Sequence, residues 1–246
     1  MKRLLTALLL SLPGTALAAG GGATAYKFDP DLGNEASLQR GAAAFINYCS
    51  GCHSMQYLRY NRIAEDLNIP EDIVRENLMF GTDKFGFPIE ANMPHMSEVW
   101  FGKVPPDLTL TARAKGDDWV YSFLKTFYVE EGRPNGVNNL TLAGASMPHV
   151  LGPLQGWNKL VEKEEGAEEA DDHGASHEPE FEMIAEGSLT PKEYDRLVAD
   201  ITNFMVYAAE PVKLVRYKIG AWALFLLAIF TTLAYLLKRE YWKDVH

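Results

Sequence analysis

Three stretches of the chain repeat apolar residues three and four positions apart, the spacing that gives a helix one apolar face. They cover residues 35–48, 117–127 and 190–208. The third opens on Thr-Pro-Lys-Glu at 190–193, where a hydroxyl residue followed by Glu forms a capping box and Pro suits the first turn. A shorter helix is expected at about 70–81, between a Pro-acidic start and a closing Gly. The pattern predicts a mainly helical region.

One further apolar stretch has no polar face. Residues 219–237 are nineteen positions without a charge, and at 1.5 Å per residue they reach about 28 Å, close to the thickness of a bilayer core. We therefore predict a transmembrane helix and assign 210–246 to a C-terminal anchor with a short cytoplasmic tail. Basic residues flank the span on both sides, so their count does not orient it.

The first residues resemble an export signal. A basic head at 2–3 precedes a short apolar stretch at 4–12 and small residues at 16–18, which is typical of a removed signal peptide. We predict that residues 1–18 are this peptide. With the anchor at the other end, the expectation is a single-pass protein of the bacterial inner membrane, with residues 19–209 in the periplasm and the C-terminus in the cytoplasm.

The segments between the helices are polar or irregular. Residues 82–110 are rich in Gly, Pro and Met and are predicted to form a loop. Residues 162–186 hold eleven acidic residues and one basic residue without apolar periodicity, so they predict a solvated acidic loop. The formal net charge of −10 disfavours nucleic acid and favours a basic protein partner. We expect the acidic loop to contribute to docking such a partner.

The chemistry of the chain centres on Cys49, Cys52 and His53, which form a Cys-x-x-Cys-His motif. Its two thiols can add to the vinyl groups of one haem c while the imidazole ligates the iron. Zinc would need further ligands, because these are the only two cysteines, and a thioredoxin-like pair would need βαβ surroundings. The motif predicts a covalently bound haem c and leaves no thiol for a structural disulfide.

The ligand on the other face of the iron stays open at this point. Met55 is too close to His53 to cross the ring, and Met205 lies on the apolar side of a predicted helix. Loop methionines and histidines are eligible by their chemistry. The candidates are Met93, Met96, Met147, His95, His149, His173 and His177. Among the methionines, Met147 has the longer chain reach, and Met93 competes because each precedes a Pro.

Together with the exported haem motif, Val-Pro-Pro-Asp-Leu-Thr at 104–109, Arg113, Met147 and the C-terminal membrane helix resemble the cytochrome c1 family. These are the haem subunits of the ubiquinol–cytochrome c reductase (bc1) complex. The resemblance implies an all-α, cytochrome c-like fold with loop insertions. It also implies that Met147 is the sixth ligand, that Pro106 and Leu108 pack against the haem, and that Arg113 pairs with a haem propionate. Residues 54–103 match the family pattern less closely.

By that resemblance the chain is an electron-transfer subunit without a catalytic site of its own. It would receive single electrons from a Rieske iron-sulfur subunit, beside cytochrome b in a dimeric complex, and pass them to a soluble or membrane-bound cytochrome c. The alternative from the same class is a tethered c-type cytochrome of an oxidase or nitrogen-oxide reductase. From other classes, a thiol–disulfide enzyme and a haem enzyme with an open sixth position remain.

Overall fold

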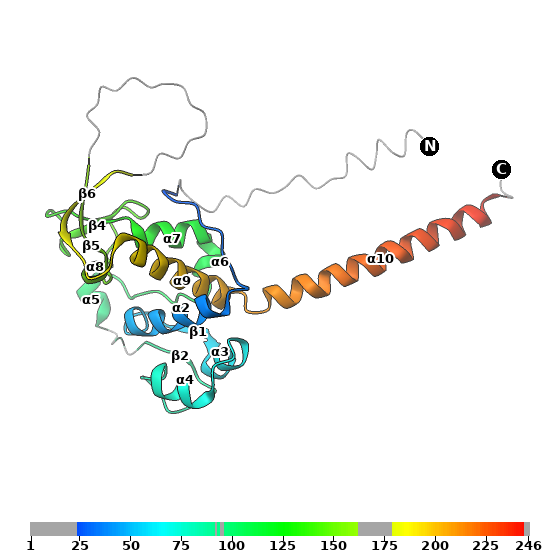
Figure 1. Ribbon diagram of the computed structural model, residues 1–246, viewed down its shortest axis with the longest axis horizontal. Helices are drawn as coiled ribbons and strands as arrows, with labels where there is room; N and C mark the ends of the chain where they lie inside the picture. The colour runs from blue at the N-terminus through cyan, green and yellow to red at the C-terminus, as the bar shows by residue number, and fades with distance from the viewer. Residues whose placement is uncertain (1–23, 92, 94–95, 162–178, 244–246) are drawn as a thin grey trace, which may run out of the picture.

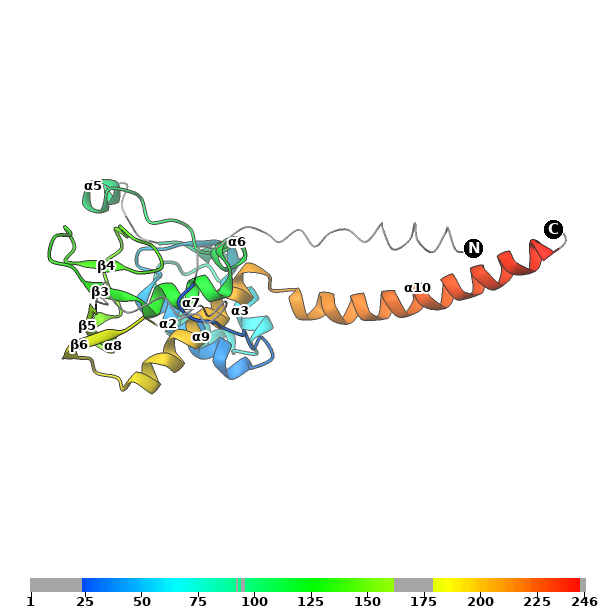
Figure 2. The same ribbon diagram turned by 90° about the horizontal axis from the view of Figure 1, so that it is seen from above.

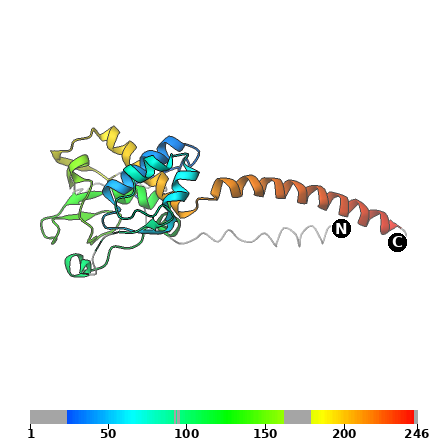
Figure 3. The same ribbon diagram turned by 90° about the horizontal axis from the view of Figure 1, so that it is seen from below.

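The computed structural model describes residues 24–91, 93, 96–161 and 179–243 (Figure 1). The predicted signal peptide, residues 1–18, lies outside them, as does most of the predicted acidic loop. Helices dominate the described part of the chain, which confirms the all-α class. One long helix projects away from the others in all three views (Figures 1, 2 and 3).

The described residues between 24 and 209 are called the soluble region below. Two helices, one near its start and one near its end, form its centre. They are α2 (Glu35–Tyr48) and α9 (Pro191–Ala209), and both match the predicted stretches. At their crossing the backbones nearly touch, because a Cβ added to Gly41 would lie 2.0 Å from the carbonyl oxygen of Asp200. One turn further along, the rings of Phe45 and Phe204 pack with their centroids 5.8 Å apart. The glycine therefore permits an approach that no side chain would allow.

Polar contacts fix the same crossing. Asp200 is only 5% exposed, yet it accepts hydrogen bonds from Ser37 Oγ at 2.6 Å and from Arg40 Nε at 2.7 Å. Asn203 Nδ2 donates to the same serine hydroxyl at 2.9 Å. Each buried polar atom named here has a partner, so the network sets the register of α2 against α9 without leaving an unpaired charge.

Both helices are capped at their first turn, and of these two caps only the α9 capping box was predicted. Asn34 at the start of α2 accepts from the backbone N–H of Ser37 at 3.1 Å. The capping box of α9 is present, with the Thr190 backbone N–H donating to Glu193 Oε2 at 2.9 Å and the Thr190 hydroxyl oxygen accepting from the Glu193 N–H. These bonds satisfy backbone donors that the first helical turn leaves free.

The third predicted helix is α7 (Asp117–Lys125), which packs on α9 through a bond from the Tyr194 hydroxyl to the carbonyl of Leu124 at 2.7 Å. It ends two residues earlier than predicted, because Phe127 begins strand β3. The short helix α6 (Thr111–Lys115), which the sequence did not indicate, precedes it and also contacts α9. Together α6, α7 and α9 form one wall of the soluble region.

Three two-stranded antiparallel ladders join the helices in the described residues, and none of them was predicted. In one ladder residues 181–186 form a strand, so the acidic loop predicted at 162–186 is shorter than expected. The ladders are β1 (Met55–Arg59) with β2 (Pro88–Ile89), β3 (Phe127–Val129) with β4 (Val137–Asn139), and β5 (Gly156–Leu160) with β6 (Phe181–Glu186).

Three short helices lie in the segment that matches the family pattern less closely. They are α3 (Tyr60–Asp66) and α4 (Glu71–Asn77), which contact each other, and α5 (Ser97–Phe101), which lies apart from α3 (Figure 2). Helix α4 corresponds to the short helix predicted at about 70–81. Helix α5 and strand β2 lie within the stretch 82–110 that was predicted to be a loop, and Figure 2 shows α5 at the edge of the molecule.

The projecting helix is α10 (Lys213–Tyr241), and it contains the predicted span 219–237. Its part Val215–Tyr241 is long and apolar enough to cross a membrane, and the most apolar window is entirely exposed in the isolated chain. An ion pair between Glu210 and Arg216 bridges the junction with α9. The exposed apolar surface is the surface that lipid would cover.

Candidate haem site

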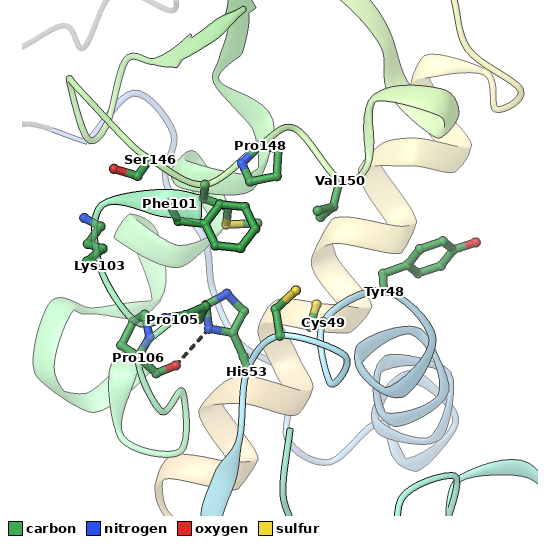
Figure 4. A pocket seen from close by; sticks show the side chains of 12 residues that line it. Tyr48, Cys49, His53, Phe101, Lys103, Pro105, Pro106, Ser146, Pro148 and Val150 are labelled. Carbon is green, nitrogen blue, oxygen red and sulfur yellow. Dashed lines mark hydrogen bonds between the residues drawn. The ribbon is translucent and has the colours of Figure 1, made fainter. Parts of the chain in front are cut away.

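The last turn of α2 delivers the cysteine motif. Cys49 is the C-cap of the helix, and its carbonyl accepts from the backbone N–H groups of Cys52 at 3.0 Å and His53 at 2.9 Å. This tight turn brings both thiols and the imidazole onto the wall of one cavity (Figure 4). Burial raises the pKa of Cys49 to about 12 and also raises the pKa of Cys52. Both thiols are therefore protonated at neutral pH in the polypeptide.

The imidazole of His53 is oriented by the segment 104–109. The Nδ1–H of its ring donates to the carbonyl oxygen of Pro106 at 2.8 Å, shown as a dashed line in Figure 4. With Nδ1 carrying the proton, Nε2 keeps its lone pair and is the atom free to ligate a metal. Burial lowers the pKa of His53, which further favours the neutral, ligating form.

Asp107 and Leu108 hold that segment in place. The Asp107 carboxylate accepts from the N–H of Gln56 at 2.8 Å and of Thr109 at 2.9 Å. The N–H of Leu108 donates to the carbonyl of Ser54 at 2.9 Å. The Pro-Pro-Asp-Leu-Thr segment is thus hydrogen-bonded to the residues that directly follow the haem motif.

The cavity consists of two adjoining hollows that share six wall residues. The larger hollow encloses about 1180 Å³, part of it open to solvent, and its lining is mostly apolar. The shared residues are Cys49, His53, Lys103, Pro106, Ser146 and Met147. Two thiols for covalent attachment, an imidazole and a thioether face one apolar space. This set of donors suits a haem, a planar and largely apolar ring with an iron at its centre. The residues present fit a haem c.

The cavity brings together six of the seven predicted site residues. They are Cys49, Cys52, His53, Pro106, Leu108 and Met147. Figure 4 shows Ser146 and Pro148, the sequence neighbours of Met147, across the cavity from His53. Arg113 lies elsewhere, in the lining of a smaller hollow with Asp117, Glu210 and Lys213.

The competing ligands lie outside this lining. Met93 and Met96 do not line either hollow, and Met96 is 60% exposed. The ring of His149 stacks on Phe127 and meets the edge of Trp157 instead of facing the cavity. Its burial lowers the pKa of His149 to about 4, so the ring is neutral at physiological pH. The positions of His95, His173 and His177 are outside the described residues.

Several wall residues were missed from the sequence. Lys103 and Lys115 supply positive charge at the cavity, and Trp119 and Phe123 supply stacked rings with centroids 5.1 Å apart. The sequence did contain a signal for the aromatic pair. Trp119 and Phe123 are four residues apart in the predicted helix 117–127, a spacing that puts both rings on one face. Nothing in the sequence separates Lys115 from Arg113 as the basic residue that faces the cavity.

The loop that carries Met147 is fixed by asparagine side chains from the β3–β4 hairpin. Asn135 Nδ2 donates to the carbonyl of Met147 at 3.2 Å. Asn138 Oδ1 accepts from the N–H of Gly144 at 2.8 Å, and Asn139 Oδ1 accepts from the N–H of Thr141 at 2.9 Å. These bonds pair backbone groups of a loop that has no ladder of its own.

Comparisons with known proteins agree with this arrangement. The model of the Cytochrome C1 family matches residues 30–82 and 79–245. Cytochrome c1 of Allochromatium vinosum is 49% identical over 100% of this chain and 99% of the relative, and cytochrome c1 of Rhodospirillum rubrum is 26% identical over 100% and 98%. A protein named ammonia monooxygenase gamma subunit, from Nitrosomonas europaea, is 40% identical over 100% and 99%. The chain therefore belongs to the cytochrome c1 family, the membrane-anchored, haem c-containing electron-transfer subunits of the bc1 complex, which are not catalytic by themselves.

Proposed function

We propose that this protein receives single electrons from a Rieske iron-sulfur subunit, beside cytochrome b, and passes them to a soluble or membrane-bound cytochrome c. The observation that carries the proposal is the cavity, in which His53 and Met147 lie on walls contributed by two distant segments. Family membership supports the setting in a bc1 complex. The complex is proposed to be dimeric.

In this proposal Cys49 and Cys52 would hold the haem covalently, and His53 and Met147 would ligate its iron. When bound, the haem supplies a one-electron Fe(III)/Fe(II) couple. The Pro106 carbonyl keeps the His53 ring in its ligating tautomer. With both of these side chains as ligands, the iron would serve electron transfer and would not be open to a substrate.

Around the ring, Pro106 and Leu108 are proposed to supply apolar contact, as expected from their place in the lining. Lys103 and Lys115 also lie there and can pair with the haem carboxylates. The propionate contact of Arg113 remains a prediction, since this side chain lines a separate hollow. Exchanging each basic residue for Gln and measuring the redox potential would tell which of them faces a propionate.

The haem region is proposed to lie in the periplasm, with the C-terminus in the cytoplasm of a bacterium. The signal-like residues 1–18 and the exposed apolar helix α10 support this orientation. Protease added to intact spheroplasts should remove the haem region and spare a C-terminal epitope tag. Protection of the haem region, with loss of the tag, would reverse the orientation.

The decisive test of the assignment is gentle detergent extraction of the full chain, followed by subunit identification and a reduced-minus-oxidised spectrum. Cytochrome b and a Rieske subunit should copurify. Subunits of a copper or haem–copper oxidase, a nitrogen-oxide reductase or an ammonia monooxygenase in their place would overturn it. A spectrum without c-type absorbance would contradict the haem assignment itself.

The ligand assignment needs a separate test. Met147→Leu should lower the redox potential and let carbon monoxide bind the reduced protein, because thioether ligation favours the ferrous form. Met96→Leu is the matched control, since Met96 is exposed and outside the cavity lining. An unchanged potential in Met147→Leu would show that another residue is the sixth ligand.

A further inference from the structure

His149 follows Met147 by two residues but points the other way. Pro148 and Val150, on either side of it, line the cavity, whereas the His149 side chain is buried in the protein with 7% exposure. Its ring lies parallel to Phe127, with centroids 4.8 Å apart and planes 8° apart. The segment from Met147 to Val150 is thus fixed to the protein by a ring on the side away from the haem cavity.

The other contacts of this ring leave little room for movement. Trp157 meets His149 edge-to-face, with centroids 5.7 Å apart and an interplanar angle of 86°. A Cβ added to Gly152 would lie 2.9 Å from the Trp157 ring and 3.2 Å from His149 Cδ2. The Gly152 N–H donates to the His149 carbonyl at 3.0 Å. Phe127, Trp157 and the Gly152 backbone together form a close-fitting socket for the His149 ring.

The polar atoms of the ring contribute less than its shape. Among the described residues, neither His149 Nε2 nor Oε1 of Gln155 makes a hydrogen bond of normal geometry, although the Gln155 side chain is close enough to raise the pKa of His149 against the larger effect of burial. A polar contact that falls short of hydrogen-bond geometry contributes little to holding the segment. The stacked and edge-on ring contacts are therefore what holds this side of the loop.

A second contact holds the loop at Met147 itself, through the bond from Asn135 to its carbonyl. The backbone of the ligand residue is fixed by the asparagine, and the chain two residues later is fixed by the ring. Between them the Met147 side chain is directed into the cavity. A thioether bound to iron requires this kind of support from outside the ligand shell.

We infer that His149 is a positioning residue for the sixth ligand: its ring, held between Phe127 and Trp157, anchors the loop that presents Met147 to the haem iron. The inference rests on the proposed ligand role of Met147. It does not require protonation of His149, and it makes the aromatic shape of the residue the property that matters.

The test compares His149→Ala with His149→Phe in the full-length holoprotein in detergent. Alanine removes the ring, so the redox potential should fall and part of the reduced protein should bind carbon monoxide. A tenfold preferential weakening of the ferrous iron–sulfur bond corresponds to about 59 mV for a one-electron couple. Phenylalanine keeps the stacking and should restore the wild-type potential and exclude carbon monoxide.

Ile63→Ala controls for a merely structural effect, because Ile63 is fully buried in α3 and lines neither hollow. It should lower the melting temperature and leave the potential unchanged. A His149→Ala protein with wild-type potential and no carbon monoxide binding would overturn the inference, and so would a His149→Phe protein that behaves like His149→Ala. Met147→Leu, measured in the same experiment, separates a failure of this inference from a failure of the proposed function. If the potential and the spectrum of Met147→Leu are unchanged, the proposed ligand role of Met147 is wrong.

Discussion

Gly41→Ala tests the contact between α2 and α9 on which the haem region depends. The new Cβ would lie 2.0 Å from the Asp200 carbonyl oxygen and 2.8 Å from Phe204 Cβ, so the helices must move apart by about 1 Å. Overpacking of this kind costs typically about 1–3 kcal/mol, and the upper end applies because the obstructing atom is backbone and cannot rotate away. Alanine recovers up to about 1 kcal/mol of helix propensity. The expected net loss is about 2 kcal/mol.

The assay is thermal unfolding of the purified holoprotein, followed by circular dichroism and by haem absorbance. For a domain of this size each kcal/mol corresponds to roughly 2–4 °C, so the melting temperature should fall by about 4–8 °C. Gly86→Ala is the control, since a Cβ there meets nothing within 4 Å. If Gly41→Ala melted at or above the wild-type temperature, the close crossing of α2 and α9 would be wrong.

Three further substitutions or treatments probe the same architecture. Asp200→Ala should cost about 3 kcal/mol, at the lower end of the range for a broken buried pair because Arg40 is half-exposed and can be solvated; a urea titration with an unchanged midpoint would contradict this. Thr190→Ala should cost about 1 kcal/mol by removing the α9 cap, while Thr190→Ser should cost less. In the haem-free protein at pH 8, iodoacetamide should modify Cys52 before Cys49, because burial raises the pKa of Cys49 to about 12 and so suppresses its thiolate. Mass mapping that finds equal labelling would refute that order.

The elements that sequence predicts best are those whose signals are local. Helix α2 has the predicted bounds, and α9 begins at its predicted cap, because amphipathic spacing and capping residues lie within the helix itself. The haem motif is local in the same sense, since five consecutive residues carry both thiols and the imidazole. Their common position on one cavity wall follows from a single turn after α2.

The ladders and the far wall of the cavity depend on contacts that no short window contains. Strand β1 pairs with residues 88–89, across the intervening helices α3 and α4. Strand β6 lies in an acidic stretch, and five of its six residues are exposed, so no alternation of buried and exposed positions marks it. Short elements are equally difficult. Helix α6 is five residues long, so its packing, and not its sequence, decides that Lys115 lines the haem cavity while Arg113 lines another hollow.

The choice of Met147 among the loop methionines is also a tertiary effect. Met93, Met96 and Met147 all lie in segments that the sequence predicts to be loops, and each offers the same thioether. In the part of the chain that the structure describes, Met147 belongs to a loop that hairpin asparagines hold against the cavity. A chain can carry the chemistry of a ligand at several positions, and the surrounding hydrogen bonds decide which of them is presented.

The connection between α9 and α10 has a consequence for how electrons reach the haem. Ile201 and Met205 of α9 line the cavity, and α9 continues for only about one turn, roughly 6 Å, before it ends at Ala209. Residues 210–212 then lead directly into the membrane-entering helix, and the Glu210–Arg216 ion pair ties the two together. Under the proposed function, so short a junction would keep the haem close to the membrane surface and limit its movement. The donor and the acceptor would then have to approach the haem, because the haem could not move far to meet them.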